Sequence, residues 1–384
     1  MNVVRNIVYL LSGWFPRSDE IVLFGAWFGK RYSDNPRYLL QEILESNRFS
    51  QKRIYWIGNS DVKPHITDSR ITFVKRNSFK SYWYQLRAKK VFVSHGFQDI
   101  GSISCLKGAM VFQLWHGFPI KHIGADDPGN STEGSNLFEQ YQYFFADSDV
   151  MANRIKTAFK NYGASDKNVI VGTQPRVDYL QENKDNSSLK RLIRKKLNIS
   201  EDATVYTYLP TFRDNSSEVF SFLRDSGTKF EEWLDNNNSV LLERQHFARN
   251  VNDKRLIESK DQRFIDLSEA VEVQDVLLIT DYLITDYSSV YIDFLTLNRP
   301  IIHFLYDGDK YIKNDRGVYA NDITSEFAGP VANNITELID YMNMPVKYFI
   351  SKNKTLKQSL GIGNETHLVD IISPVTTVKA TQKE

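Results

Sequence analysis

The stretch FQLWHGFPIKHIG, residues 112–124, gathers side chains that could do chemistry at the end of an apolar run. A neutral imidazole at His116 could take a proton from a hydroxyl near neutral pH. Gly117 has no Cβ, so the backbone there could approach a ligand closely. Lys121 and His122 make the same loop cationic, which would suit an anionic substrate, although a histidine in a loop more often only hydrogen-bonds its neighbours.

A second His-Gly pair follows the preceding apolar run, at His95-Gly96. One such pair is a weak signal. Two pairs that end successive strands suggest a crevice lined by both, because parallel strands bring their carboxyl ends to one edge of a sheet. We therefore expect His95 and His116 to line one ligand cleft.

Basic side chains also end two apolar runs in the second half of the chain. Pro210 ends the first run and is followed by Thr211 and Arg213, and the second run ends in Arg244 and His246. An arginine can hold phosphate through a bidentate fork. A surface ion pair of Arg213 with its neighbouring aspartate, or a structural role for His246, would explain the same residues without a ligand.

The segment Thr285-Asp286-Tyr-Ser288-Ser289 predicts a strand that turns into a helix. No Glu or Gln lies three residues after either serine, so no capping box competes for the first free amides of that helix. Those amides and hydroxyls would favour a phosphate. Asp293, on the same helix, could accept from ribose hydroxyls. An ordinary N-cap would explain the serines but neither aspartate.

Two D-x-D triplets, at residues 147–149 and 307–309, invite a metal interpretation. Such triplets arise by chance in acidic chains, and no third ligand is evident beside either. We expect no metal site.

The sequence around these residues predicts alternating strands and helices, which must position them. Most strand candidates are continuous apolar runs, as in parallel strands buried on both faces, and the alternation predicts an α/β fold. A polar stretch at residues 182–188 separates two halves of similar size, so a ligand would lie in the cleft between them. The predicted strands are 21–27, 53–57, 71–75, 91–94, 111–115, 143–146, 169–171, 204–209, 240–243, 264–267, 282–285 and 301–305.

Composition narrows the class of protein further. The chain has 384 residues, 41% hydrophobic and 25% charged, with a formal charge of +1 and one cysteine. These values fit about two globular domains, give no sign of nucleic-acid binding, and exclude a disulfide framework within one chain. No apolar run approaches the roughly 20 residues of a membrane span.

The N-terminal segment allows two interpretations. Apolar residues 7–11 and an aromatic pair, Trp14-Phe15, lie between Arg5 and Arg17. The segment is either an amphipathic helix docked on the core or an interfacial membrane helix with basic flanks. No small-residue cleavage site follows, so we expect no signal peptide.

Together the motifs resemble the CDP-glycerol glycerophosphotransferase family, whose members make wall teichoic acid and related capsule polymers. The ordered set is specific, although no single member is, and the similarity covers roughly residues 20 to 345. The motifs are Phe24-Gly-Ala-Trp-Phe-Gly29, Ser33-Asp-Asn-Pro-Arg37, Trp115-His-Gly with Lys121 and Gly124, Pro175-Arg-x-Asp178, Pro210-Thr-Phe-Arg213, Thr285-Asp-Tyr-Ser-Ser289 with Asp293, Arg299-Pro300, Tyr306-Asp307 and Arg316-Gly317.

The resemblance implies a GT-B type arrangement, with two Rossmann-like domains whose parallel sheets face a central cleft. The expected parts are an N-terminal amphipathic segment (1–19), an acceptor-side domain (20–190), a donor-binding domain (191–374) and a polar tail (375–384). The turn Gly172-Thr-Gln-Pro175 has one residue more than the family pattern, which leaves the details of that loop open.

The resemblance also implies the reaction, which is transfer of glycerol phosphate or ribitol phosphate from a CDP-polyol to an acceptor hydroxyl, with release of CMP. By resemblance, His116 is the base, His246 contacts the donor phosphate, and the Ser288-Ser289 helix start binds the pyrophosphate. No cofactor is expected beyond the CDP-polyol donor.

The expected acceptor is a lipid-linked saccharide or a polyol-phosphate polymer. The expected place is therefore the cytoplasmic face of a bacterial membrane, peripherally bound, and a homo-oligomer is compatible with the sequence. A sugar transferase with a nucleotide-sugar donor would share the fold, and a non-catalytic scaffold is a third hypothesis.

Overall fold

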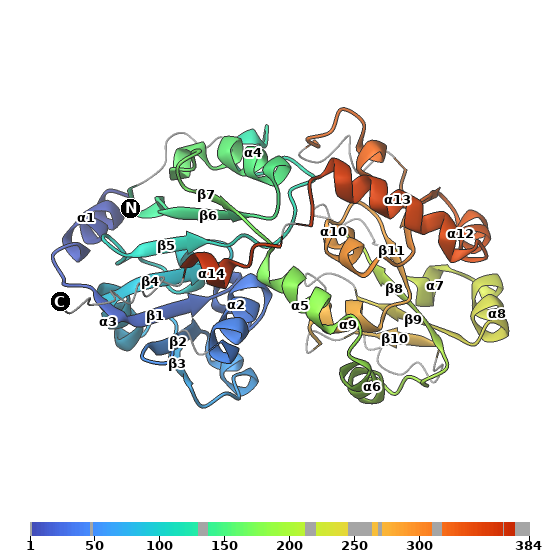
Figure 1. The fold of residues 1–384 in the computed structure, drawn as a ribbon, viewed down its shortest axis with the longest axis horizontal. Coiled ribbons are helices and arrows are strands. Elements are labelled where there is room, and N and C mark those ends of the chain that lie inside the picture. Colours follow the sequence, from blue (N-terminus) through green and yellow to red (C-terminus); the bar gives the residue numbers. More distant parts are fainter. Residues whose placement is uncertain are drawn as a thin grey trace, which may run out of the picture.

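The structure is a computed structural model that describes residues 2–46, 49–129, 137–211, 220–244, 263–267, 271–308, 317–363 and 365–372. Two α/β domains lie side by side along the longest axis of the molecule (Figure 1). The predicted α/β class and the GT-B type arrangement are confirmed.

The first domain is built on a seven-stranded sheet with the order β3-β2-β1-β4-β5-β6-β7, in which every pair is parallel. All seven predicted strands of this half are present within a few residues. The elements are α1 (Asn2–Ser12), β1 (Ser18–Gly25), α2 (Asp34–Glu45), β2 (Arg53–Gly58), β3 (Ile71–Lys75), α3 (Phe79–Arg87), β4 (Ala88–Val93), β5 (Met110–Gln113), β6 (Tyr143–Ala146), α4 (Asp149–Ala158), β7 (Val169–Val171) and α5 (Pro175–Asn183).

The second domain has a six-stranded parallel sheet with the order β10-β9-β8-β11-β12-β13. The sequence predicted five of these strands and missed the two-residue β13. The helices and strands that follow α5 in the chain are α6 (Ser187–Lys196), β8 (Thr204–Leu209), α7 (Phe222–Asp225), α8 (Thr228–Asn236), β9 (Ser239–Glu243), β10 (Phe264–Asp266), α9 (Val273–Ile279), β11 (Tyr282–Thr285), α10 (Val290–Phe294), β12 (Ile301–Phe304), β13 (Val331–Ala332), α12 (Ile335–Met342), α13 (Val346–Ser359) and α14 (Leu368–Ile372), of which α14 packs on the first domain.

Aromatic side chains fix the register of the central strands in the first sheet. Phe24, Phe92 and Phe112 stack across β1, β4 and β5, with ring centroids 4.9 and 4.8 Å apart. The strands carry apolar side chains on both faces because helices cover both faces. This packing holds the carboxyl ends of β4 and β5 at the same edge of the sheet, and His95 and His116 follow them there.

Helices α5 and α6 lead from the first domain to the second, and the C-terminal helix α14 needs a correction. Helix α6 packs against α9 of the second domain, and α5 contacts both α2 and α9. Helix α14, which was assigned to the second domain, returns to the first (Figure 1), where its apolar residues join the core beside Phe24 and Leu39. A five-residue segment such as α14 carries no information in its sequence about which of the two sheets it will cover.

Helix α1 contacts the protein through its polar side. The Asn6 side chain accepts from the Leu137 amide at 3.1 Å, and the Arg5 guanidinium lies 5.9 Å from the Phe138 ring centroid. Tyr9 packs against the core of the first domain, as a docked helix would require, but most apolar side chains of α1 face solvent. The exposed ones are Val3, Val4, Ile7, Leu10 and Leu11, followed by Trp14 and Phe15.

None of the helices in the described part of the chain combines the length and the hydrophobicity that crossing a membrane requires.

Candidate active site

A cavity of about 250 Å³ lies between the two domains, at the carboxyl ends of their strands. This is the position at which open α/β sheets bind ligands. The first domain and α5 contribute Trp27, Arg31, Ser33, Asp34, His116, Gly117 and Arg176, and the second domain contributes Arg244, Glu272, Val273, Gln274, Ser288, Ser289, Val290 and Asp293.

His116 has the environment of a neutral base. Its Nδ1 lies 3.3 Å from the Ser94 carbonyl oxygen, an acceptor, so Nδ1 carries the proton and the lone pair of Nε2 is left for a substrate. Burial lowers the pKa of His116 to about 4, against a smaller opposing effect of the Ser94 hydrogen bond. The imidazole is therefore uncharged at neutral pH.

His95 lies behind His116 and does not line the cavity. The two rings are stacked with centroids 4.0 Å apart and an interplanar angle of 3°. Burial, and then the neighbouring His116, lower the pKa of His95 well below its usual value. Asp99 holds this turn by accepting from the amides of Ser94 and His95, each at 2.8 Å. The predicted crevice of two histidines is thus a stack in which only His116 meets the cavity.

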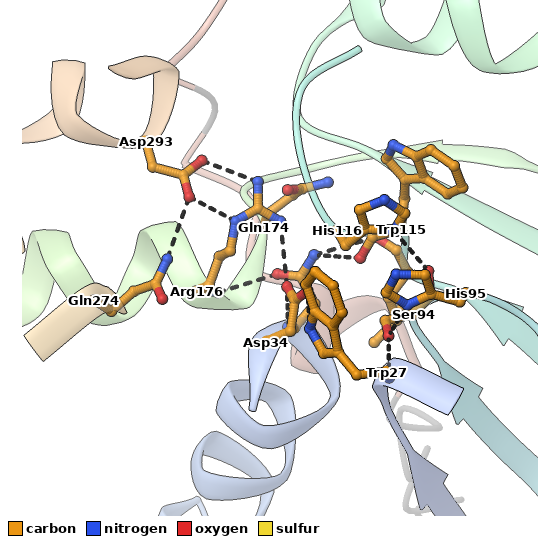
Figure 2. A network of polar contacts seen from close by, with 12 residues as sticks. Trp27, Asp34, Ser94, His95, Trp115, His116, Gln174, Arg176, Gln274 and Asp293 are labelled. Atoms are coloured by element: carbon orange, nitrogen blue, oxygen red, sulfur yellow. Dashed lines mark hydrogen bonds and ion pairs between the residues drawn. The ribbon is translucent and has the colours of Figure 1, made fainter. Parts of the chain in front are cut away.

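Several residues around His116 have left-handed backbones that side chains rarely adopt. Trp27 (φ 50°), Asp34 (φ 63°) and Trp115 (φ 59°) are among them. Such conformations cost roughly 1–3 kcal/mol each and persist only where surrounding contacts enforce them. Asn35 provides one of these contacts. Its side-chain amide nitrogen donates to the carbonyl oxygens of Leu114 and Trp115 at 3.2 and 3.0 Å. Figure 2 shows the indole of Trp27 beside both histidine rings.

On the opposite wall, Asp286 shapes the turn before the serines. One of its carboxylate oxygens accepts from the Thr211 amide and hydroxyl, both at 2.7 Å, and from the Ser288 amide at 3.1 Å. Helix α10 begins at Val290 with Ser289 as its N-cap, and the structure gives no side-chain capping bond there. The predicted helix start is confirmed, and Ser288 and Ser289 both line the cavity.

The two walls approach each other at Gly117. A Cβ on Gly117 would lie 2.9 Å from the Ser289 hydroxyl oxygen, closer than real Cβ contacts. Gly117 therefore allows a close approach to Ser289, while its predicted approach to a ligand stays a prediction.

Two predicted donor-binding residues have other partners in this structure. The Thr285 hydroxyl is buried and donates to the Leu209 carbonyl at 2.7 Å, which ties β11 to β8. Asp293 accepts from Arg176 Nε and Nη2 at 2.7 and 2.9 Å, and from Gln274 at 3.2 Å (Figure 2). Asp293 thus joins the two domains in this structure, and its predicted ribose contact stays a prediction.

Lys121 and His122 lie outside the cavity and join the domains at another point. Lys121 forms an antiparallel bridge with Val318, and the His122 amide donates to the Gly317 carbonyl at 3.1 Å. The His122 ring packs edge-on against Tyr319 at 4.7 Å. Their predicted role toward an acceptor phosphate stays a prediction.

Of the predicted basic residues, Arg244 lines the cavity and donates to the Val271 carbonyl at 2.9 Å. Arg213 and His246 lie outside the described residues. Within the described ranges, no group of three or more His, Cys, Asp or Glu side chains could hold a metal ion.

Sequence reasoning missed the contributions of Trp27, Asp34, Arg176 and Gln274 to the cavity. Three of the four lie in motifs quoted for the family resemblance, namely the Phe24–Gly29, Ser33–Arg37 and Pro175–Asp178 segments. The sequence assigned them no chemical role. A tryptophan after a strand, or an arginine in the first turn of a helix, indicates a function only once its partner across the cleft is known.

The two parallel sheets and the cleft between them define an α/β protein of the GT-B fold. Solved structures of the wall teichoic acid polymerase TagF have the same fold. One of them matches with a TM-score of 0.77 at 22% identity, and the match covers 95% of this chain and 90% of that chain.

The chain belongs to the CDP-glycerol:poly(glycerophosphate) glycerophosphotransferase family, whose model matches residues 7–357. It is 28% identical to the teichoic acid poly(glycerol phosphate) polymerase of Bacillus spizizenii, over 92% of this chain and 90% of the relative. It is 30% identical to the teichoic acid glycerol-phosphate transferase of Staphylococcus aureus, over 84% and 83%. The predicted family and enzyme class are confirmed: the chain is a polyol-phosphate transferase with a CDP-polyol donor.

Proposed function

We propose that the chain transfers glycerol phosphate from CDP-glycerol to a hydroxyl of a polyol-phosphate or lipid-linked saccharide acceptor, with release of CMP. The choice of glycerol over ribitol follows the relatives. The two glycerol-phosphate enzymes match 92% and 84% of this chain, whereas a Staphylococcus aureus ribitol-phosphate polymerase matches 77% at 26% identity.

One observation carries the mechanism: His116 and Gly117 lie opposite Ser288 and Ser289 across a single cavity. An acceptor hydroxyl beside Nε2 of His116 loses its proton to that nitrogen as its oxygen bonds to the β-phosphorus. The bond from that phosphorus to the bridging oxygen breaks in line, and CMP leaves with the electron pair. The serine hydroxyls and Arg244 hold the phosphates, and positioned donors of this kind can contribute as much as the base.

No metal ion is required in this proposal, because arginines line the donor side of the cavity together with the two serines. Arg244 belongs to the second domain and Arg176 to the connecting helix α5. Both arginines stay charged at neutral pH, so they supply positive charge without a bound cation.

Helix α1 supports a peripheral position on the membrane that carries a lipid-linked acceptor. It presents its apolar side chains to solvent while its polar side holds the protein. Residues 2–17 contain Arg5 and Arg17 and no Asp or Glu. An exposed apolar helix face without acidic residues suits the interface of an anionic bilayer.

The test of the mechanism is His116→Ala with His65→Ala as its control, since His65 is exposed on a distant turn. Loss of a general base typically lowers turnover about 10²–10⁴-fold. CMP release from CDP-glycerol, with acceptor present, should fall by that much in His116→Ala only. Excess EDTA should leave the wild-type rate unchanged. Near wild-type turnover in His116→Ala would contradict the base assignment, and CMP release from CDP-ribitol alone would contradict the choice of glycerol.

A further inference from the structure

Arg176 is a buried arginine whose third nitrogen is left over. It lies in the first turn of α5, and its side chain is 4% exposed. Nε and Nη2 donate to the two oxygens of Asp293 across the domain boundary. Nη1 has no hydrogen-bond acceptor among the described residues. A buried charged donor without an acceptor is costly, so such a group calls for a partner.

The surroundings of Nη1 indicate where that partner would be. Arg176 lines the cavity together with His116 and Ser288. The nearest acidic atom recorded for Nη1 is Oδ1 of Asp34, at 3.7 Å, which is beyond hydrogen-bonding distance. Figure 2 shows the guanidinium with Asp293 on one side and with Asp34 and His116 on the other. Nη1 is therefore close to the reaction site and is not satisfied by the protein.

We propose that Nη1 of Arg176 donates to a non-bridging oxygen of the donor's β-phosphate, the phosphoryl group that is transferred. The inference rests on the proposed function and adds a catalytic residue to it. No bond to Arg176 forms or breaks. Its N–H groups stabilise charge on the phosphoryl oxygens while the acceptor oxygen attacks and CMP leaves.

The ion pair with Asp293 fixes the position of the Arg176 guanidinium and so makes its contact with the phosphate effective. Two fixed nitrogens leave the guanidinium little freedom, so Nη1 needs no reorganisation during the reaction, which is the condition for electrostatic preorganisation. Asp34 does not compete at hydrogen-bonding distance, because its Oδ1 lies 3.7 Å from Nη1. A phosphate oxygen in the cavity would thus gain the bond that Asp34 does not make.

A purely structural role is the alternative, since Arg176 also ties the domains together. The chain offers a matched comparison in Arg154 on α4, which pairs with Glu326 of the second domain. Arg154 Nη1 donates to the Pro119 carbonyl at 2.8 Å, and its Nη2 donates to Glu326, so both terminal nitrogens have acceptors. Arg154 does not line the cavity, so a substitution of Arg154 affects only the contacts that hold the two domains together.

The experiment compares Arg176→Lys with Arg154→Lys in calorimetric titrations with CDP and CMP, which differ by the β-phosphate. Lysine keeps a positive charge for the buried carboxylate but cannot hold Asp293 and a phosphate at once. Wild type should bind CDP more tightly than CMP. Arg176→Lys should lose about tenfold of that preference, equivalent to roughly 1.4 kcal/mol, with unchanged CMP affinity, and its kcat with CDP-glycerol should fall. Arg154→Lys should keep both properties.

A double variant, Arg176→Met with Asp293→Asn, removes both charges of this ion pair and keeps the test valid if the lysine variant does not fold. An unchanged CDP preference in a folded Arg176 variant, with only a lower melting temperature as in Arg154→Lys, would overturn the inference. If wild type releases no CMP from CDP-glycerol, the proposed function fails, and the role of Arg176 fails with it. The two failures are distinguished by the behaviour of wild type.

Discussion

At the scale of single residues, the site combines a neutral base with fixed donors. His116 is kept uncharged by burial, and its Nδ1 faces the Ser94 carbonyl, so its tautomer suits proton acceptance at Nε2. The sequence could predict that a His-Gly pair would reach a cleft. It could not predict that the ring of His95 would stack on the ring of His116, because this stacking depends on how two loops pack.

The low pKa of His116 makes a prediction for the pH profile. Because the folded pKa is near 4 instead of near 6.5, the base form persists to lower pH, so kcat/KM should stay flat from about pH 7.5 to pH 5 as far as His116 is concerned. Asp34, with a pKa of about 6, is another cavity group that titrates in this window. The profile should therefore be measured for wild type and for Asp34→Asn.

An acid limb centred near pH 6.5 that persists in Asp34→Asn would contradict the assignment of His116. Circular dichroism is needed alongside. The unfolded chain binds the His116 proton below about pH 6.5, whereas the folded chain binds it only near pH 4, so this group makes the folded state less stable as pH falls through that window.

At the scale of elements, strands were easier to predict than the residues that meet at their ends. Continuous apolar runs located β8 and β11 because both faces of a parallel strand are buried. Asp293 illustrates the limit. Its place on the helix after Ser289 was correctly predicted, but its partner Arg176 lies 117 positions earlier on α5. Periodicity carries no information about contacts at that separation.

Helix α1 provides the prediction that belongs to this scale. Ile7→Glu with Leu10→Glu places charge on its exposed apolar face, and Asn2→Glu adds charge on the other side of the same helix. Binding to vesicles that contain anionic phospholipid should fall at least about tenfold in the double variant, because apolar burial drives interfacial binding. Sedimentation with vesicles measures it, and CMP release with a soluble acceptor should not change.

Equal vesicle binding by Asn2→Glu and by the double variant would show that the apolar face of α1 is not what contacts lipid.

At the scale of the whole molecule, the active site depends on how the two domains are held. Arg176–Asp293 and Arg154–Glu326 cross the boundary, and Lys121 bridges to Val318. Each domain supplies one wall, so neither contains the site alone. The boundary was predictable from a polar stretch, whereas these ties were not, because they join charged residues that look solvated in the sequence.

The segment before α14 is part of this arrangement, because it pairs with the turn that precedes α5, the helix that carries Arg176. The Thr173 amide donates to the Thr366 carbonyl at 2.9 Å, and a Cβ on Gly172 would lie 2.6 Å from that same carbonyl oxygen. The turn Gly172-Thr-Gln-Pro175, which departs from the family pattern by one residue, is thus the place where the chain end attaches.

Leu368→Ala and Ile371→Ala test how much α14 stabilises the first domain. Leu368 is fully buried against the first sheet, whereas Ile371 on the same helix is 40% exposed. Truncating a buried leucine typically costs about 2–5 kcal/mol, through lost apolar contact and the cavity left behind. Leu368→Ala should lower the free energy of unfolding in urea by that amount, and Ile371→Ala by less than about 0.5 kcal/mol. If the two variants unfold at the same urea concentration, α14 does not stabilise the first domain, and the attachment at Thr173 must hold the chain end by itself.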